Sequence, residues 1–183
     1  MKEMGLGAYR FSICWPRVIP EGVGAVSESG LGFYDRLVDE LLAAGIEPYA
    51  TLFHWDYPLA LQRQGGWLNP ASADWFDAYA RVVVDRLSDR VSHWLTINEP
   101  HVFIVMGHGT GEHAPGLKLP ISDQVLISHN VMRAHGMAAR TIRERAKTKP
   151  LIGWAPVGVV SYPVSDDPAD VEAARKETFA SSA

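Results

Sequence analysis

Three things are scarce in this sequence: cysteine, an excess of basic residues, and long apolar runs. Cys14 is the only cysteine, so neither an intramolecular disulfide nor a zinc cluster built on thiolates can form. Lys and Arg total 17 against 21 Asp and Glu, and this net charge of −4 argues against a nucleic-acid-binding surface. The longest mostly apolar run, residues 151–163, is broken by glycine and proline and is shorter than the ~20 residues that span a membrane.

The rest of the composition is that of an ordinary globular protein. Of 183 residues, 47% are hydrophobic and 21% are charged, so burial can offset the entropy lost on folding. No stretch resembles a linker, and residues 1–5 lack the apolar core of a signal peptide. We therefore expect one cytoplasmic domain that binds neither nucleic acid nor a membrane.

Four short apolar runs alternate with helical patterns along the chain. The runs cover residues 8–13, 47–54, 93–98 and 151–157 and predict β-strands. The helical patterns begin near Gly30, Asn69-Pro70, Ser122-Asp123 and Asp167-Pro168. This alternation predicts an α/β fold with parallel strands. Periodicity alone leaves two architectures open, a doubly wound sheet and part of a TIM (β/α)8 barrel.

Local signals set the expected boundaries of these elements. An apolar stripe at helical spacing is formed by Phe33, Tyr34, Leu37, Val38, Leu41 and Leu42, and Gly45 is placed to end that helix. Asn69 followed by Pro70 predicts an N-cap and a first helical position. Residues 16–28 and the segment after Pro100 are rich in glycine and proline, which predicts loops.

The unusual polar residues collect where the predicted strands end. Arg10 lies within the first strand, His54 ends the second, and Asn98 and Glu99 end the third. Parallel α/β folds carry their chemistry at the carboxyl ends of the strands, and a carboxylic acid beside such groups suits general acid catalysis. Taken singly, each has a structural alternative: a solvated loop acid for Glu99, a core histidine for His54, and a structural ion pair for Arg10.

The other motifs give weaker evidence for a functional site. Most of the six tryptophans are expected in the core, with Trp15 and Trp55 as candidates for ligand stacking because they sit at strand ends. The glycine-rich segment 107–111 lacks the spacing of a dinucleotide fingerprint, and His108 and His113 lack the spacing of a zinc helix. The sequence therefore predicts neither a metal nor a cofactor. Cys14 has no evident base and is expected to be a small buried residue.

Several motifs resemble glycoside hydrolase family 1, the β-glucosidase type. They stand in the family order and are residues 9–17 (Tyr-Arg-Phe-Ser-Ile-Cys-Trp-Pro-Arg), 53–58 (Phe-His-Trp-Asp-Tyr-Pro), 65–67 (Gly-Gly-Trp), 96–100 (Thr-Ile-Asn-Glu-Pro) and 111–116 (Gly-Glu-His-Ala-Pro-Gly). The segment 96–100 resembles the family's acid/base signature. The resemblance covers essentially the whole chain.

This resemblance implies a TIM barrel and a retaining glycosidase acting on a β-glycoside. By position, Glu99 would be the general acid/base and Asn98 would bond the sugar 2-hydroxyl. His54 would bond another hydroxyl of the same sugar. Arg10 would lie beneath the nucleophile and orient it. These roles fit the residue types, since a neutral acid protonates the leaving oxygen and then serves as a base toward water.

The resemblance also implies that residues 1–183 are an incomplete catalytic domain, truncated at both ends, with about four βα units covering roughly strands 2–5 of the barrel. A complete barrel has eight units in about 250 residues. The nucleophile would lie outside the chain; Glu112 and Asp56 are available substitutes that nothing else favours. A non-catalytic half-barrel that assembles with another chain or self-associates is the alternative, and a flavodoxin-like nucleotide-binding sheet is a third.

An open half-barrel is expected to be unstable alone. Its inner face would meet water in place of the opposite strands, so some apolar strand residues should be exposed. The candidates are Phe11, Ile13, Leu52, Phe53, Leu95 and Ile97. Such exposure would favour aggregation or pairing with a second copy.

Overall fold

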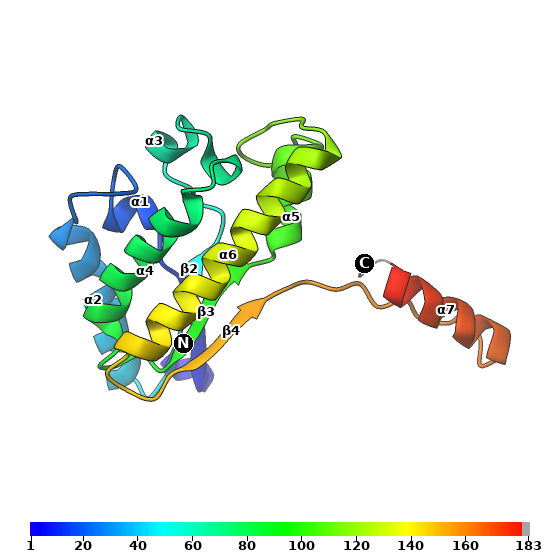
Figure 1. The fold of residues 1–183 in the computed structure, drawn as a ribbon. Helices are drawn as coiled ribbons and strands as arrows, with labels where there is room; N and C mark the ends of the chain where they lie inside the picture. The colour runs from blue at the N-terminus through cyan, green and yellow to red at the C-terminus, as the bar shows by residue number, and fades with distance from the viewer. Residues whose placement is uncertain (181–183) are drawn as a thin grey trace.

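Four parallel strands form the sheet in the order β1-β2-β3-β4, each paired with the next one along the chain (Figure 1). The computed structural model describes residues 1–180. The strands are β1 (Ala8–Ser12), β2 (Glu47–Phe53), β3 (His93–Asn98) and β4 (Leu151–Ala155). The four predicted strands and their parallel arrangement are confirmed. The fourth ends before Pro156, which lacks the N–H that a strand would donate.

Seven α-helices and three short helices connect and flank the strands of the described chain. The α-helices are α1 (Trp15–Val18), α2 (Glu28–Ala43), α3 (Leu59–Gln62), α4 (Ser72–Leu87), α5 (Pro100–Ile104), α6 (Ile121–Arg145) and α7 (Pro168–Ala180). The short ones are the 3-10 helices η1 (Lys2–Met4) and η2 (Gly66–Leu68) and the π-helix η3 (Val105–Gly109). Helices α2, α4 and α6 cover one face of the sheet, with α4 packed against both others (Figure 1).

The apolar core lies between these helices and the strands. Its largest fully buried side chains include Trp15, Trp67, Trp94, Tyr34, Tyr79, Phe53 and Phe76. The prediction that apolar strand residues are exposed is wrong for five of the six candidates: Phe11, Ile13, Leu52, Phe53 and Ile97 belong to this core, and Leu95 is half-buried. Several exposed strand positions are taken by polar or small residues, among them Arg10, Ser12 and Gly153, although Tyr9 and Leu151 are exposed as well.

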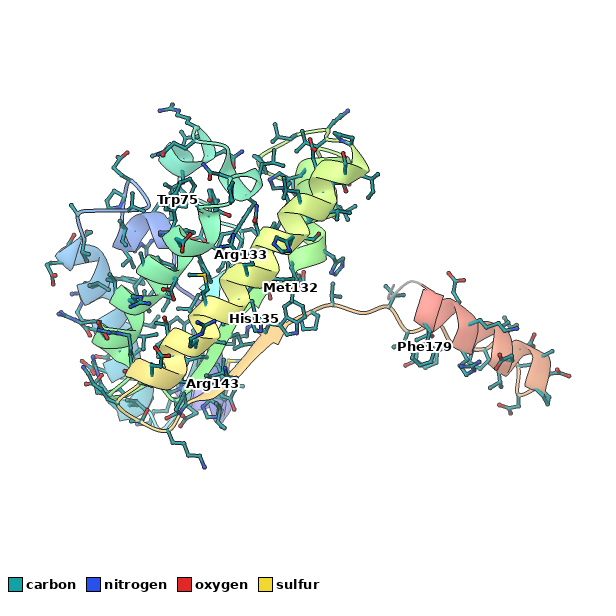
Figure 2. All side chains as sticks on the ribbon, viewed as in Figure 1. Trp75, Met132, Arg133, His135, Arg143 and Phe179 are labelled. Carbon is teal, nitrogen blue, oxygen red and sulfur yellow. The ribbon has the colours of Figure 1, made fainter. Side chains whose placement is uncertain are left out.

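The segment after β4 departs from the sheet. It runs outward to α7, which lies apart from the other helices (Figure 1). Phe179 on α7 is 64% exposed (Figure 2), and the segment itself exposes Val159, Val160, Tyr162 and Val164. Apolar side chains are therefore exposed on this segment and on α7, whereas none of the strand residues that the sequence suggested is exposed.

The helix starts differ from the predicted ones by a few residues. Helix α4 begins at Ser72, because the Asn69 side chain accepts a hydrogen bond from the Ala71 N–H (2.9 Å) and forms a turn before the helix. Helix α6 begins at Ile121, ahead of the predicted cap at Ser122. Helix α7 does begin at Pro168, as Asp167-Pro168 predicted.

Two predicted loops contain helices. Residues 15–18 form α1, where Pro16 occupies the first turn and therefore costs no intrahelical hydrogen bond. The segment after Pro100 forms α5 and then η3, although its glycines predicted a loop. Both helices start at the ends of strands, so they set the backbone around the predicted site.

Helix α2 follows its sequence signals more closely. The Ser27 hydroxyl accepts a hydrogen bond from the Gly30 N–H (3.1 Å) and caps the helix. Gly45 ends it with a φ of 72°, in the left-handed region that glycine adopts without strain. Within the predicted apolar stripe, Tyr34, Val38 and Leu41 are buried, Leu37 is half-buried, and Phe33 and Leu42 are exposed.

Candidate functional site

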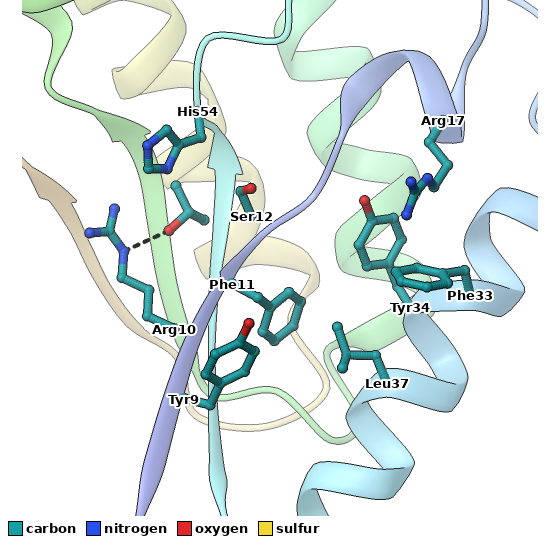
Figure 3. Close-up of a pocket in the computed structure, with 10 residues that line it drawn as sticks. Tyr9, Arg10, Phe11, Ser12, Arg17, Phe33, Tyr34, Leu37 and His54 are labelled. Atoms are coloured by element: carbon teal, nitrogen blue, oxygen red, sulfur yellow. Dashed lines mark hydrogen bonds between the residues drawn. The ribbon is translucent and has the colours of Figure 1, made fainter. Parts of the chain in front are cut away.

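The predicted site residues come together at the carboxyl ends of β1, β2 and β3. The Arg10 guanidinium donates from Nη2 to Asn98 Oδ1 (2.6 Å) and from Nε to Thr51 Oγ1 (2.9 Å). The Asn98 Nδ2 and the His54 Nε2 are 3.2 Å apart. Figure 3 shows His54 at the end of β2 with Arg10 near it, and its dashed line marks the hydrogen bond that Arg10 donates to Thr51. One hydrogen-bonded network therefore links three strands, and we call Arg10, Thr51, His54 and Asn98 the strand-end network.

The network fixes the hydrogen-bonding state of its members. Asn98 is 3% exposed and its Oδ1 accepts from Arg10, so its Nδ2 is left to donate to His54 Nε2. The His54 Nε2 is then an acceptor and the proton of the neutral ring is on Nδ1. Burial and then the Arg10 charge lower the pKa of His54, outweighing the opposite effect of Glu99 and Asp56. His54 is therefore neutral near pH 7.

Glu99 directly follows Asn98 and is half-buried. Its φ is 41°, a left-handed conformation that is strained for a residue with a side chain. Two contacts hold it there: its N–H donates to the Ala155 carbonyl of β4 (2.7 Å), and Pro100 starts α5 immediately after it. The carboxyl group is thus placed by strands β3 and β4 next to the strand-end network.

Trp55 is half-buried and also lies at this edge. Its φ is 82°, and its indole Nε1 donates to the Asn98 carbonyl (3.0 Å). The His113 ring lies against it, with ring centroids 5.4 Å apart. Trp55 also borders a cavity of about 260 Å³ lined largely by aromatic and apolar side chains, including Tyr57 and Phe103.

The prediction that Trp15 stacks on a ligand is wrong. Its side chain is fully buried, its Nε1 donates to the Gly22 carbonyl (2.9 Å), and its ring stacks on Tyr79 with centroids 5.0 Å apart. Cys14 is half-buried, so it is less buried than the sequence suggested, and its N–H donates to the Tyr34 hydroxyl (2.7 Å). Burial, followed by the neighbouring Asp56, raises the pKa of the Cys14 thiol, which disfavours the reactive thiolate.

A cavity of about 440 Å³ runs along β1 beside the strand-end network (Figure 3). Arg10, Thr51 and His54 line one part of it, and aromatic rings from α2 line another. The Arg17 guanidinium lies 4.5 Å from the centre of the Phe33 ring. The opening is large enough for a sugar-sized molecule and is lined by charged and hydroxyl groups at the end nearest the network.

Neither substitute nucleophile is poised for that role. One oxygen of Asp56 is buried and the other accepts the Trp15 N–H (2.9 Å). Glu112 is exposed on the loop that follows η3. One member of the network, Thr51, was not predicted from the sequence. This residue is fully buried, and its place beside β1 follows from the strand register, in which it pairs with Ser12.

The structure also bears on metals and membranes. Within residues 1–180, no group of three or more His, Cys, Asp or Glu side chains is arranged to hold a metal ion. No helix in that range has the length and apolar character needed to cross a bilayer.

The parallel β/α sheet carries an acid, an amide, an imidazole and a guanidinium at its carboxyl edge, which is the edge where TIM-barrel enzymes place their active-site residues. The family model "Glycosyl hydrolase family 1" matches residues 1–182, and the chain belongs to that family.

Individual relatives agree with this assignment. The chain is 44% identical over 180 residues to 1,4-beta-D-glucan glucohydrolase of Thermotoga neapolitana, and 48% identical over 147 residues to Beta-glucosidase A of Thermotoga maritima. The alignments cover 96% and 80% of this chain but only 41% and 33% of those relatives. The β-glucosidase of Thermotoga maritima in complex with deoxynojirimycin superposes with a TM-score of 0.86 at 44% identity, covering 96% of this chain and 39% of that one.

Proposed function

We propose that this chain supplies the acid/base half of a retaining β-glucosidase, with Glu99 as the general acid/base. The observation that carries the proposal is the strand-end network beside Glu99: Arg10 fixes Asn98, and Asn98 fixes His54. Oriented hydrogen-bonding groups of this kind suit the hydroxyls of one sugar ring. The proposal rests further on the family, whose retaining members use two carboxyl groups about 5–5.5 Å apart.

In this reaction Glu99 gives its proton to the glycosidic oxygen as the bond to the sugar breaks. The second carboxylate, which in this proposal comes from outside residues 1–183, forms the bond to the sugar. Glu99 then takes a proton from water while that water displaces the second carboxylate, which restores both groups. Neither step requires a metal or a cofactor.

The remaining network residues bind and orient. Neutral His54 can donate a hydrogen bond from Nδ1 to a sugar hydroxyl without titrating, and Asn98 lies beside it for the 2-hydroxyl. Arg10 holds Asn98 and, in this proposal, lies beneath the second carboxylate and orients it.

A cytoplasmic location completes the proposal, supported by a composition with a single cysteine.

The test uses a chimera in which residues 1–183 replace the segment of Thermotoga maritima β-glucosidase that they match; we call it the barrel chimera. Glu99→Gln should reduce turnover of an unactivated disaccharide far more than turnover of an aryl β-glucoside with a good leaving group, because only the disaccharide needs the proton. Exposed Glu112→Gln is the matched control. Equal, small effects of Glu99→Gln on both substrates would exclude Glu99 as the acid.

A second candidate is a non-catalytic half-barrel that assembles with another chain or with a second copy. Two observations favour it: β1 and β4 are the edges of the described sheet, and the segment before α7 exposes apolar side chains. Exposed edges and the apolar segment before α7 are surfaces that another chain could cover. The solution mass of residues 1–183 separates this candidate from a monomeric enzyme.

A further inference from the structure

Asp56 is a carboxylate that the proposed reaction does not use, and it lies in the turn that follows β2. It follows Trp55, whose left-handed backbone (φ 82°) is strained for a residue with a side chain and persists only where neighbouring contacts enforce it. Backbone strain of this kind tends to occur at functional sites. The contacts of Asp56 and Trp55 show what holds this turn.

The Asp56 carboxylate ties the end of β2 to the turn after β1. Its Oδ2 accepts the Trp15 N–H (2.9 Å), and Trp15 is anchored in the core through its own indole. The Cys14 thiol and the backbone N–H of His54 also face this carboxylate. Burial raises the pKa of Asp56, and hydrogen bonds from Cys14 and from backbone N–H groups lower it by less. The groups that face this carboxylate are hydrogen-bond donors, so the position requires an acceptor oxygen.

On the other side of the turn, Trp55 and His54 both contact Asn98. The Trp55 Nε1 donates to the Asn98 carbonyl (3.0 Å), and the His54 Nε2 is 3.2 Å from the Asn98 Nδ2. The backbone of the turn closes further through the Tyr57 N–H, which donates to the Trp55 carbonyl (3.0 Å). A shift of this turn would therefore move two of the groups that contact Asn98.

We propose that Asp56 is a positioning residue: by accepting the Trp15 N–H it locks the turn at residues 54–56 against the β1 end and so holds His54 and Trp55 on Asn98. The expected effect on kcat rests on the proposed function, whereas the expected positions of His54 and Trp55 do not. The role belongs to the acceptor oxygen and not to the charge.

The experiment compares Asp56→Ala with Asp56→Asn in the barrel chimera. Alanine removes the acceptor, so kcat should fall about 10-fold to 100-fold, the scale expected when reacting groups move by about 1 Å. Asparagine keeps an oxygen for the Trp15 N–H and should restore most of that kcat. Asp77→Ala is the matched control: Asp77 is a buried carboxylate that joins α4 to α6 through Thr141, so its loss should lower the melting temperature and leave kcat unchanged below it.

Crystal structures of the two Asp56 variants give a readout that needs no activity. In Asp56→Ala we expect Trp55 to leave the left-handed region and its bond to the Asn98 carbonyl to break; Asp56→Asn should keep both. If that bond persists in Asp56→Ala, the inference is overturned, whether or not the chimera is active. If asparagine loses as much kcat as alanine, the charge matters and the acceptor role is wrong. An inactive parent chimera would count against the proposed function alone.

Discussion

Replacing Arg10 by methionine tests the strand-end network most broadly. Methionine keeps much of the aliphatic stem and removes the guanidinium, which donates to Asn98 Oδ1 at 2.6 Å and to Thr51 Oγ1 at 2.9 Å. Asn98 and Thr51 are 3% and 0% exposed, so water cannot readily replace the lost donors. Because Arg10 itself is exposed, each bond is counted at about 1 kcal/mol, below the range for charge-assisted hydrogen bonds, which gives a loss of about 2 kcal/mol in total. In the barrel chimera, which is about 2.5 times as long as this chain, that corresponds to a melting temperature lower by about 2 °C.

The same change has a second, independent effect on His54. The positive charge of Arg10 disfavours the protonated imidazole, so its removal should raise the pKa of His54. Burial is the larger influence and persists in the variant, where Glu99 and Asp56 continue to oppose it. Protonation of His54 would then begin at a higher pH than in the parent protein.

The assay is an NMR titration of the His54 ring in the barrel chimera, with thermal unfolding followed in parallel. Exposed Arg63→Met is the control and should move neither quantity. A His54 pKa that stays constant or falls in Arg10→Met would refute the electrostatic coupling. An unchanged melting temperature would show that the two hydrogen bonds do not stabilise the fold.

Two further changes test other parts of the proposal. His54→Ala should lower the rate of the barrel chimera and keep the acidic limb of its pH profile, because neutral His54 binds and does not transfer a proton; loss of that limb would contradict this role. Residues 1–183 alone should self-associate, because their sheet has two open edges and because Phe179 and several valines are exposed to solvent. They should show no turnover of an aryl β-glucoside, because the proposed second carboxylate is outside them. A monodisperse monomer whose turnover is abolished by Glu99→Gln would contradict both expectations.

Much of the fold could be predicted because the relevant signals are local. Alternation of strand and helix patterns predicted four parallel strands, and β3 (His93–Asn98) has the predicted ends. Short helices were missed because glycine and proline in the first turns of α1 and in η3 are compatible with helical backbone. Strand exposure was mispredicted because several exposed strand positions carry polar or small residues, such as Arg10 and Ser12 on β1, while the apolar candidates pack in the core.

The site was predictable to the level of which residues gather, because parallel strands bring their carboxyl ends together. Its hydrogen bonds were not predictable, because the Arg10 contact with Thr51 depends on the register of β1 against β2. The left-handed backbone of Trp55 and Glu99 was not predictable either, because neither residue is a glycine. Trp15 looked like a ligand-stacking residue for the same reason as Trp55, since position at a strand end does not reveal on which side of the turn a ring packs. The roles of Arg10, His54, Asn98 and Glu99 in catalysis remain predictions.

The most direct test of the central claim is the crystal structure of the barrel chimera with deoxynojirimycin, the compound in the solved Thermotoga maritima complex. We predict that the bound ring lies at the carboxyl ends of β2 and β3, with its hydroxyls within about 2.7–3.2 Å of His54 and Asn98 and with the Glu99 carboxyl beside it. A compound bound elsewhere, with His54 and Asn98 making no contact to it, would contradict the proposal that these strand ends form the sugar-binding half of a β-glucosidase.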